Sequence, residues 1–129
     1  MFSLQNKKIL VTGGNGFLGT YLVKKLTGKR KISSKNIFIS SAKELDLRQW
    51  ENCQKAVKGQ NIVFHLAAHL GGAGYQQKNQ AAIFHDNVLM SINLMEAARQ
   101  AGVEKFITIS SITAYPKDAK PPFKEKDFW

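Results

Sequence analysis

The sequence predicts an α/β protein, a parallel sheet covered by helices on both faces, and three observations support this fold class. Short apolar runs, "ILV", "IFIS", "IVFH" and "FITIS", alternate along the chain with amphipathic stretches of helical length. The runs are apolar throughout, which is typical of strands buried on both faces. A glycine cluster, "GGNG", stands between the first apolar run and the first amphipathic stretch. Alternating strands and helices build right-handed crossovers and hence a doubly wound sheet.

The first half of the chain supplies two strands and two helices. The run "KKILVTG" is a short buried strand, and residues 17–26 have apolar side chains at helical spacing, with Gly28 as the end signal. Residues 36–40, "NIFIS", form a second strand rich in β-branched and aromatic side chains. The segment "ELDL" is a short extended piece, and residues 48–57 form a second helix that Gly59 ends.

The second half repeats this alternation with a longer helix. "NIVFHLAA" is another buried strand, and the glycine-rich loop "HLGGAGYQQKNQ" leads into a helix over about residues 81–101 that Gly102 ends. Four apolar side chains share one face of this helix: Phe84, Val88, Ile92 and Met95. "KFITISS" is the next strand, and its open apolar edge leads us to expect that the isolated chain is poorly soluble or self-associates. Residues 116–129 hold all three prolines and no periodicity, which predicts a loop.

Length and composition indicate one ordinary globular domain. The chain has 129 residues, of which 43% are hydrophobic, and this is enough to bury a core. Its one cysteine, Cys53, excludes an internal disulfide and a multi-cysteine zinc site, so we expect a reducing compartment and no metal site. No apolar run approaches the roughly 20 residues of a membrane span, and the start lacks the apolar core of a signal peptide. We therefore expect a cytoplasmic protein without a membrane partner.

The net charge of +10 is concentrated in the first third of the chain, where nine basic residues precede the first acidic one, Glu44. Such asymmetry is found in proteins that bind nucleic acid or another polyanion. The alternative is a solvated surface, with five of the cations placed favourably near a helix C-terminus: Lys24, Lys25, Lys29, Arg30 and Lys31. We favour the solvated surface and expect no nucleic-acid partner, because no aromatic residues interleave with the lysines. A positive field would also suit a small phosphate-bearing ligand.

The glycine cluster has the spacing of a phosphate-binding loop, with Gly13, Gly16 and Gly19 three residues apart. Gly13 allows a tight turn off the strand, and Gly16 lets a pyrophosphate approach the backbone without a Cβ in the way. Gly19 lets the helix pack closely on the sheet, and the helix N-terminus offers free N–H groups to the anion. A buried strand before it and an amphipathic helix after it favour a Rossmann-type dinucleotide site over a turn that binds nothing. We therefore assign residues 1–115 to a dinucleotide-binding domain.

Further cofactor contacts are expected from the ends of the later strands, on the same edge of the sheet. An acidic residue that binds the adenosine ribose usually closes the second strand, but here Ser40 and Ser41 stand there, with Lys43 just beyond. This favours NADP over NAD, because serine and lysine suit a 2′-phosphate that an acid would repel. Asp46 is a candidate for the adenine amino group. Two residues that end the strand "NIVFHLAA" are small enough for the cofactor to lie against this strand: Ala67 and Ala68.

The histidines and the cysteine have different expected roles. We expect His65 to be a packed strand residue and His85 to be exposed or packed against another helix. His69 follows the strand end, where it either faces the nicotinamide or substrate or has no such role. Cys53 is more consistent with a structural residue than with a nucleophile.

Five motifs together, in this order, resemble the extended short-chain dehydrogenases/reductases, which are sugar-nucleotide epimerases, dehydratases and reductases. They are "VTGGNGFLG", "LDLR", "HLAA", Asn87 in the long helix, and "ISSITAYP", and they cover essentially the whole chain. The loop "HLAAHLGG" and the tail "AYPKDAKPPFKEKDFW" are most similar to the GDP-L-fucose synthase branch.

The resemblance implies a role for each matching residue. Its pyrophosphate would be lined by Gly13, Gly16, Phe17 and Leu18, and its adenine by Asp46 and Leu47. The inner half of the cofactor would be lined by Leu66, Ala67, Ala68 and Asn87. Ser111 matches the catalytic serine that hydrogen-bonds the reacting sugar oxygen. Thr113 would be a second polar group at the substrate, although the fucose synthase branch has a cysteine there.

The resemblance also implies an activity, hydride transfer between NADP or NAD and a carbon of a nucleotide sugar, and a homodimer for the full-length enzyme. The family's chemistry needs a Tyr-x-x-x-Lys pair after the serine strand, but Tyr115 has Ala119 four residues on. We therefore expect this chain to be the N-terminal part of a longer enzyme and inactive alone, with residues 116–129 leading to the catalytic segment. The alternative is a non-catalytic NAD(P)-binding module or redox sensor.

Overall fold

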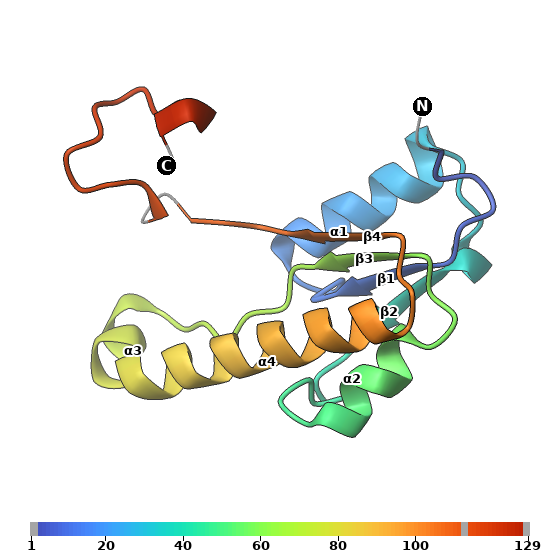
Figure 1. Cartoon of the computed structure of the whole chain (residues 1–129), viewed down its shortest axis with the longest axis horizontal. Helices are drawn as coiled ribbons and strands as arrows, with labels where there is room; N and C mark the ends of the chain where they lie inside the picture. Colours follow the sequence, from blue (N-terminus) through green and yellow to red (C-terminus); the bar gives the residue numbers. More distant parts are fainter. Residues whose placement is uncertain (1–2, 112–113, 128–129) are drawn as a thin grey trace.

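A four-stranded parallel sheet with helices on both faces forms the body of the protein (Figure 1). The computed structural model describes residues 3–111 and 114–127. The strands are β1 (Ile9–Thr12), β2 (Ile37–Ser40), β3 (Ile62–His65) and β4 (Lys105–Thr108). They lie in the order β2-β1-β3-β4, and every neighbouring pair is parallel. The predicted α/β class and parallel sheet are confirmed.

The helices divide between the two faces of the sheet. One face carries α1 (Phe17–Lys24), which continues into η1 (Lys25–Lys29), and the other carries α2 (Trp50–Val57) and α4 (Gln80–Gln100). Side chains of β1 alternate between two cores, with Leu10 packed toward α2 and α4 and with Ile9 and Val11 packed toward α1. All three are fully buried, as expected of a strand covered on both sides.

The strand register places four residues in one row at the carboxyl edge of the sheet. Thr12 pairs with Ser40 on one side and with His65 on the other, and His65 in turn pairs with Thr108. The loops that leave β1, β2 and β3 therefore start side by side. Ligands of open parallel sheets bind outside this edge.

Helix α4 packs on the sheet and on α2, but not through the apolar face that the sequence analysis identifies. Leu94, Ala97 and Ala98 are its buried residues, and the two alanines let α2 approach closely. The four residues of the apolar face are instead exposed to between 38% and 72%: Phe84, Val88, Ile92 and Met95. They do share one face, but it points away from the described core.

Three local expectations were wrong. Gly28 does not end the first helix, because the helix continues as a π-helical turn to Lys29. The segment "ELDL" is not a strand, because Glu44 and Leu47 each belong to a turn and the Asp46 carboxylate accepts a hydrogen bond from the backbone N–H of Arg48. The glycine-rich loop contains a short helix, α3 (Ala73–Lys78).

The segment after β4 leads away from the sheet (Figure 1). Within it Tyr115 stacks on Phe123 with ring centroids 4.8 Å apart, and η4 (Glu125–Asp127) is a single helical turn. The division of the chain at residue 115 stays a prediction. Within the described ranges, no helix is both long and apolar enough to cross a membrane.

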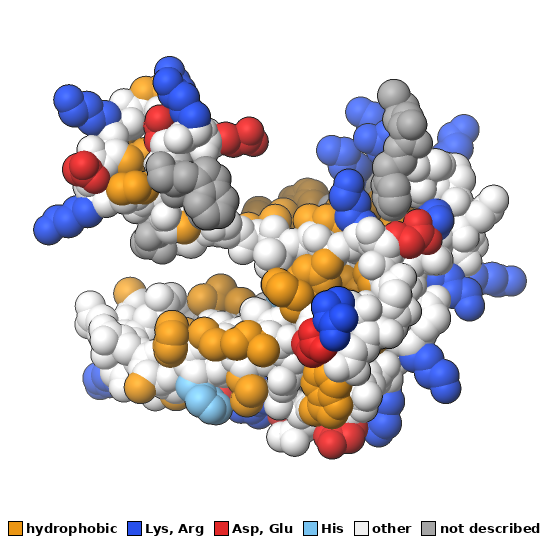
Figure 2. Space-filling model, in the orientation of Figure 1, with side chains coloured by type: hydrophobic (Ala, Val, Ile, Leu, Met, Phe, Trp, Pro, Cys, Tyr) orange, Lys and Arg blue, Asp and Glu red, His pale blue; other side chains and the backbone are white. Residues whose placement is uncertain are grey.

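The five cations predicted near the end of the first helix are all exposed. Figure 2 shows Lys and Arg gathered around the end of the molecule where α1 finishes. The α1 N-terminus and the glycine loop lie at the other end of that helix, so these cations do not line the predicted phosphate site.

Candidate cofactor site

The glycine loop between β1 and α1 is pressed against the end of β3. Gly13 has a φ of +66°, and a Cβ built there would lie 2.8 Å from the backbone N of Ala67 and the carbonyl carbon of Leu66. A Cβ on Gly19 would collide with the backbone oxygen of Gly13. Both glycines are therefore required by close backbone approach, as the sequence predicts.

The N-terminus of α1 fits an anionic group. Gly16 is the N-cap, no side chain caps this end in the described part of the chain, and no acidic residue lies in the first turn. The first N–H groups of a helix have no partner inside the helix, so those of residues 17–19 point into the space beyond Gly16. Of the atoms in the described residues, a Cβ on Gly16 would meet the Gly13 oxygen alone, at 3.2 Å, so the glycine keeps that approach open. The loop and the helix end thus fit a pyrophosphate.

A buried polar chain joins the ends of β1 and β3 beneath this loop. The Thr12 hydroxyl accepts hydrogen bonds from the backbone N–H groups of Leu66 and Ala67, both at 3.2 Å. Its own proton is therefore donated to His65 Nδ1 at 2.8 Å, which leaves His65 Nε2–H to donate to the Ser91 hydroxyl at 3.2 Å. Burial lowers the pKa of His65, in agreement with a neutral ring. His65 is thus the packed strand residue that the sequence predicts.

The end of β2 has the two serines and the lysine expected there, and the Glu44 carboxylate lies beside them. Ser40 is buried, and Lys43 is exposed. The Ser41 hydroxyl donates a hydrogen bond to the Glu44 carboxylate at 3.0 Å. A 2′-phosphate at Ser41 would have to displace this carboxylate.

Asp46 is held by Arg48 in the turn after β2. The Arg48 guanidinium donates to both carboxylate oxygens, with the shortest N···O distance 2.7 Å, and the Arg48 side-chain and backbone hydrogen bonds lower the Asp46 pKa. Leu47 is buried in the core beside α2. The contact of Asp46 with adenine stays a prediction, and in this arrangement adenine would share the carboxylate with Arg48.

His69 and Asn87 fix the loop that follows β3. The Asn87 side chain accepts a hydrogen bond from the His69 N–H at 2.6 Å and donates one to the His69 carbonyl at 3.0 Å. The His69 ring contacts Asp86 on α4 through Nδ1 and Tyr75 on α3 through Nε2. Residues 66–68 lie between β3 and this anchored residue, and the main chain of Leu66 and Ala67 contacts the glycine loop.

Three residues of this edge were not predicted: Arg48, Tyr75 and Asp86. Arg48 donates to Asp86 at 3.0 Å and so links the turn after β2 to α4. Hydrogen bonds from His85, His69 and Arg48 together lower the pKa of Asp86. The sequence signal for this group was the arginine in "LDLR", because the three residues come from separate segments of the chain.

The two predicted substrate residues follow β4. Ser111 lies three residues beyond Thr108, on the same edge as the glycine loop, and its carbonyl accepts a hydrogen bond from the Ala114 N–H at 3.0 Å. Thr113 lies outside the described residues. Their catalytic roles stay predictions.

Cys53 and His85 lie apart from the predicted phosphate site. The Cys53 thiol is buried and donates to the Leu47 carbonyl at 3.0 Å, and burial raises its pKa to about 11. A thiol with this pKa is a poor nucleophile at neutral pH. His85 is largely exposed and contacts Asp86 at 3.1 Å. Among the described residues, no group of three or more His, Cys, Asp or Glu could hold a metal ion.

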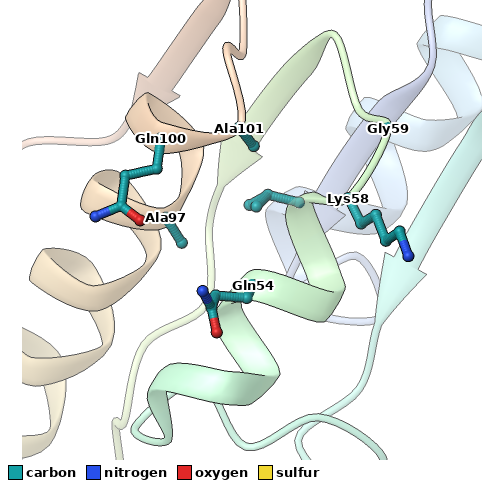
Figure 3. A pocket seen from close by; sticks show the side chains of 7 residues that line it. Gln54, Lys58, Gly59, Ala97, Gln100 and Ala101 are labelled. Carbon is teal, nitrogen blue, oxygen red and sulfur yellow. The ribbon is translucent and has the colours of Figure 1, made fainter.

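A separate hollow of about 400 Å³ lies between the C-terminal ends of α2 and α4 (Figure 3). Its lining includes Gln54, Lys58, Ala97 and Gln100. These residues come shortly before β3 and β4 in the chain, so the hollow is at the opposite edge of the sheet from the glycine loop. It is not the dinucleotide site.

Comparison with known proteins identifies the family. The model of the NAD dependent epimerase/dehydratase family matches residues 9–128. The chain belongs to this family. Two relatives are the GDP-mannose 3,5-epimerase of Arabidopsis thaliana, 33% identical over 97% of this chain, and the GDP-L-fucose synthase of Sinorhizobium fredii, 27% identical over 98%. This chain spans 37% and 40% of their lengths.

Solved structures show the same fold with NADP present. The GDP-mannoheptose C4 reductase MlghC of Campylobacter jejuni, with NADP bound, has a TM-score of 0.82 at 28% identity. The comparison covers 96% of this chain and 39% of MlghC. A GDP-L-fucose synthetase of Naegleria fowleri bound to NADP has a TM-score of 0.77 at 30% identity, covering 98% of this chain and 38% of that one.

Proposed function

We propose that the chain is the NAD(P)-binding region of a sugar-nucleotide epimerase, dehydratase or reductase. One observation carries the proposal: the Gly13–Gly19 loop and the uncapped start of α1 form a backbone cradle beside the ends of β1 and β3. Family membership and two structural neighbours with NADP bound support it.

In this proposal the predicted residues contact different parts of the cofactor and the substrate. The N–H groups of residues 17–19 bind the pyrophosphate, with the exposed side chains of Phe17 and Leu18 beside it. Asp46 and Leu47 lie on the adenine side, whereas residues 66–69 and Asn87 lie on the nicotinamide side. When bound, the nicotinamide would supply or accept the hydride that is exchanged with a carbon of the sugar. Ser111 donates a hydrogen bond to the sugar oxygen, and Thr113 is the second polar contact.

We favour NADP over NAD. The end of β2 offers Ser40, Ser41 and the exposed cation Lys43, which suit a 2′-phosphate. The Glu44 carboxylate on Ser41 opposes this preference, so NADPH binding would require the Ser41–Glu44 hydrogen bond to open.

The proposed substrate is a nucleotide sugar with a GDP group, because the relatives described above are named for GDP-linked sugars. A homodimer of the full-length protein would cover the exposed apolar face of α4. The proposed location is the cytoplasm.

Titration of the purified protein with NADPH and with NADH tests the proposal. We expect saturable binding of both, tighter for NADPH, and Lys43→Ala should reduce the preference for NADPH while leaving NADH binding unchanged. GDP-mannose added to the NADP⁺ complex then tests for hydride transfer through the absorbance of NADPH and through the sugar products, because an epimerase or dehydratase returns the hydride and accumulates no NADPH. Cofactor binding without transfer, in a protein of family length, would favour the non-catalytic module. If neither NADPH nor NADH binds, both the enzyme and the non-catalytic NAD(P)-binding module are contradicted.

A further inference from the structure

Three side chains from different elements form a continuous hydrogen-bonded chain beyond the end of β3. The Tyr75 hydroxyl lies 3.0 Å from His69 Nε2, and His69 Nδ1 lies 2.9 Å from Asp86 Oδ2. The two aromatic rings are tilted against each other with centroids 5.8 Å apart. Tyr75 belongs to α3, Asp86 to α4, and His69 to the loop between β3 and α3.

The hydrogen-bonding capacity of each group fixes the direction of this chain. Asp86 is ionised, because the Arg48 guanidinium lies 3.0 Å from Oδ2 and the His85 ring 3.1 Å from Oδ1. A carboxylate only accepts, so His69 donates from Nδ1 and leaves a lone pair on Nε2 when the ring is neutral. The Tyr75 hydroxyl is then the donor to Nε2. This is the arrangement of a hydroxyl activated by a base that a third group orients.

The surroundings hold both rings in place. The His69 backbone is fixed from both sides by the Asn87 side chain, at 2.6 and 3.0 Å. A Cβ on Gly71 would collide with the Tyr75 ring, so the glycine makes room for it. The Gln76 side chain also donates to the Gly71 carbonyl at 2.6 Å, which ties the loop to α3.

Exposure increases along the chain from α4 outward. The side chain of Asp86 is 14% exposed and that of His69 is 28% exposed, whereas Tyr75 is 44% exposed. Helix α3 lies on the side toward which the strands point (Figure 1), and Figure 2 shows an open gap between the α3–α4 layer and the segment after β4. The phenol is therefore the accessible end of the chain, on the ligand side of the sheet.

We propose that Tyr75 exchanges a proton with a hydroxyl group of the nucleotide sugar, with His69 as the proton acceptor behind it and Asp86 as the positioning residue. In the forward direction the sugar O–H bond breaks and its proton joins Tyr75 Oη, while the original phenol proton moves to His69 Nε2. The electron pair stays on the sugar oxygen, and Asp86 stabilises the imidazolium. The identity of the ligand rests on the proposed function, whereas activation of Tyr75 by His69 does not.

Acetylation by N-acetylimidazole, followed by peptide mass spectrometry, tests the activation without any turnover. Tyr21 is the internal control, because it is more exposed, at 62%, and its ring contacts Phe17 instead of a base. We expect Tyr75 to react at least about tenfold faster than Tyr21 despite its lower exposure. His69→Gln should bring the Tyr75 rate down to that of Tyr21, and Asp86→Asn should reduce it in part. Equal rates in the native protein, or an unchanged rate in folded His69→Gln, would overturn the proposal.

Protection tests the ligand. GDP-mannose added to the NADPH-saturated protein should slow acetylation of Tyr75 several-fold and leave Tyr21 unchanged, and Tyr75→Phe should bind NADPH with native affinity. A fast Tyr75 that GDP-mannose does not protect would remove the sugar from the proposal. Failure of NADPH to bind would instead contradict the proposed function and leave the acetylation rates as a separate result.

Discussion

The two ends of the carboxyl edge of the sheet differ in the groups that form them. The cradle between β1 and α1 consists of backbone, with Gly13 and Gly19 packed against neighbouring main chain and helix N–H groups aimed outward. The corner between β3 and α4 consists of side chains, in which Arg48, Asp86 and His69 share hydrogen bonds. The cradle depends on the absence of a Cβ at its glycines, whereas the corner depends on the hydrogen-bonding groups of its side chains.

This difference teaches where substitution is tolerated. A Cβ added at Gly13 or Gly19 meets main chain that cannot move aside, so even a methyl group is costly there. The corner is partly exposed, and its ion pairs are screened by water, so a single replacement there changes chemistry more than stability.

Substitution of Gly13 should have the largest effect. In Gly13→Ala the left-handed backbone and the contact with Ala67 and Leu66 should together lower the free energy of unfolding by about 4 kcal/mol. Urea denaturation measures this loss. Gly28→Ala is the matched control, because its φ is not positive and a Cβ there meets no atom of residues 3–111 or 114–127 within 4 Å. An equal loss in both variants would contradict the rigid cradle.

Removal of the Thr12 hydroxyl should have the next largest effect. Thr12→Val leaves the Ala67 N–H and His65 Nδ1 without their partner, whereas the Leu66 N–H keeps the Thr12 carbonyl at 3.2 Å, and we expect a loss of about 3 kcal/mol. Thr20→Val is the control, since its exposed hydroxyl donates to the Gly16 carbonyl one helical turn earlier and joins no strands. Equal melting temperatures for the two variants would show that the buried chain does not join the strands.

Acid should weaken the cradle through His65. Its pKa is lowered in the folded state, so the unfolded chain binds more protons below its ordinary value of 6.5. The stability that neutral His65 contributes is therefore complete above pH 6.5 and is lost as the pH falls toward the folded pKa, with a slope of at most about 1.4 kcal/mol per pH unit. Urea denaturation at pH 7.5, 6.5 and 5.5 measures it. His65→Gln should flatten this slope, whereas exposed His85→Gln should retain it.

Replacement of Arg48 should have the smallest effect on stability and a clear effect on the pKa of the Asp46 carboxyl. In Arg48→Gln the Asp46 pKa should rise toward 3.8, because Arg48 supplies the hydrogen bonds that lower it. Carboxyl carbon NMR titration measures this change, and the melting temperature at pH 7 should change little. Arg99→Gln, which removes the exposed pair with Glu96, should leave Asp46 unaltered. An unchanged Asp46 titration in Arg48→Gln would refute the described corner.

The cradle could be predicted from the sequence because its signal is local. The glycine spacing, the preceding apolar run and the following helix all lie within residues 9–26. The strands could be predicted for the same reason, since each is a short run of apolar residues.

The corner could not be predicted because its parts meet only in three dimensions. Tyr75 and His69 lie in a segment whose glycines suggested a loop, which also concealed α3. The turn at Asp46 depends on a hydrogen bond from the Arg48 N–H to the Asp46 carboxylate. The alternation of acidic and apolar residues in "ELDL" is also typical of a strand, so the sequence does not distinguish the two. The packed strip of α4 uses Ala97 and Ala98, whose small side chains give a weak apolar signal.

The most direct test of the central claim is amide NMR of the protein titrated with NADPH. The account predicts saturable binding, with the largest shifts at the N–H groups of residues 13–19 and at Leu66 and Ala67, and no response at the hollow between Gln54 and Gln100. Saturable binding that leaves the 13–19 amides unmoved, or no binding at all, would contradict the glycine loop as the dinucleotide site.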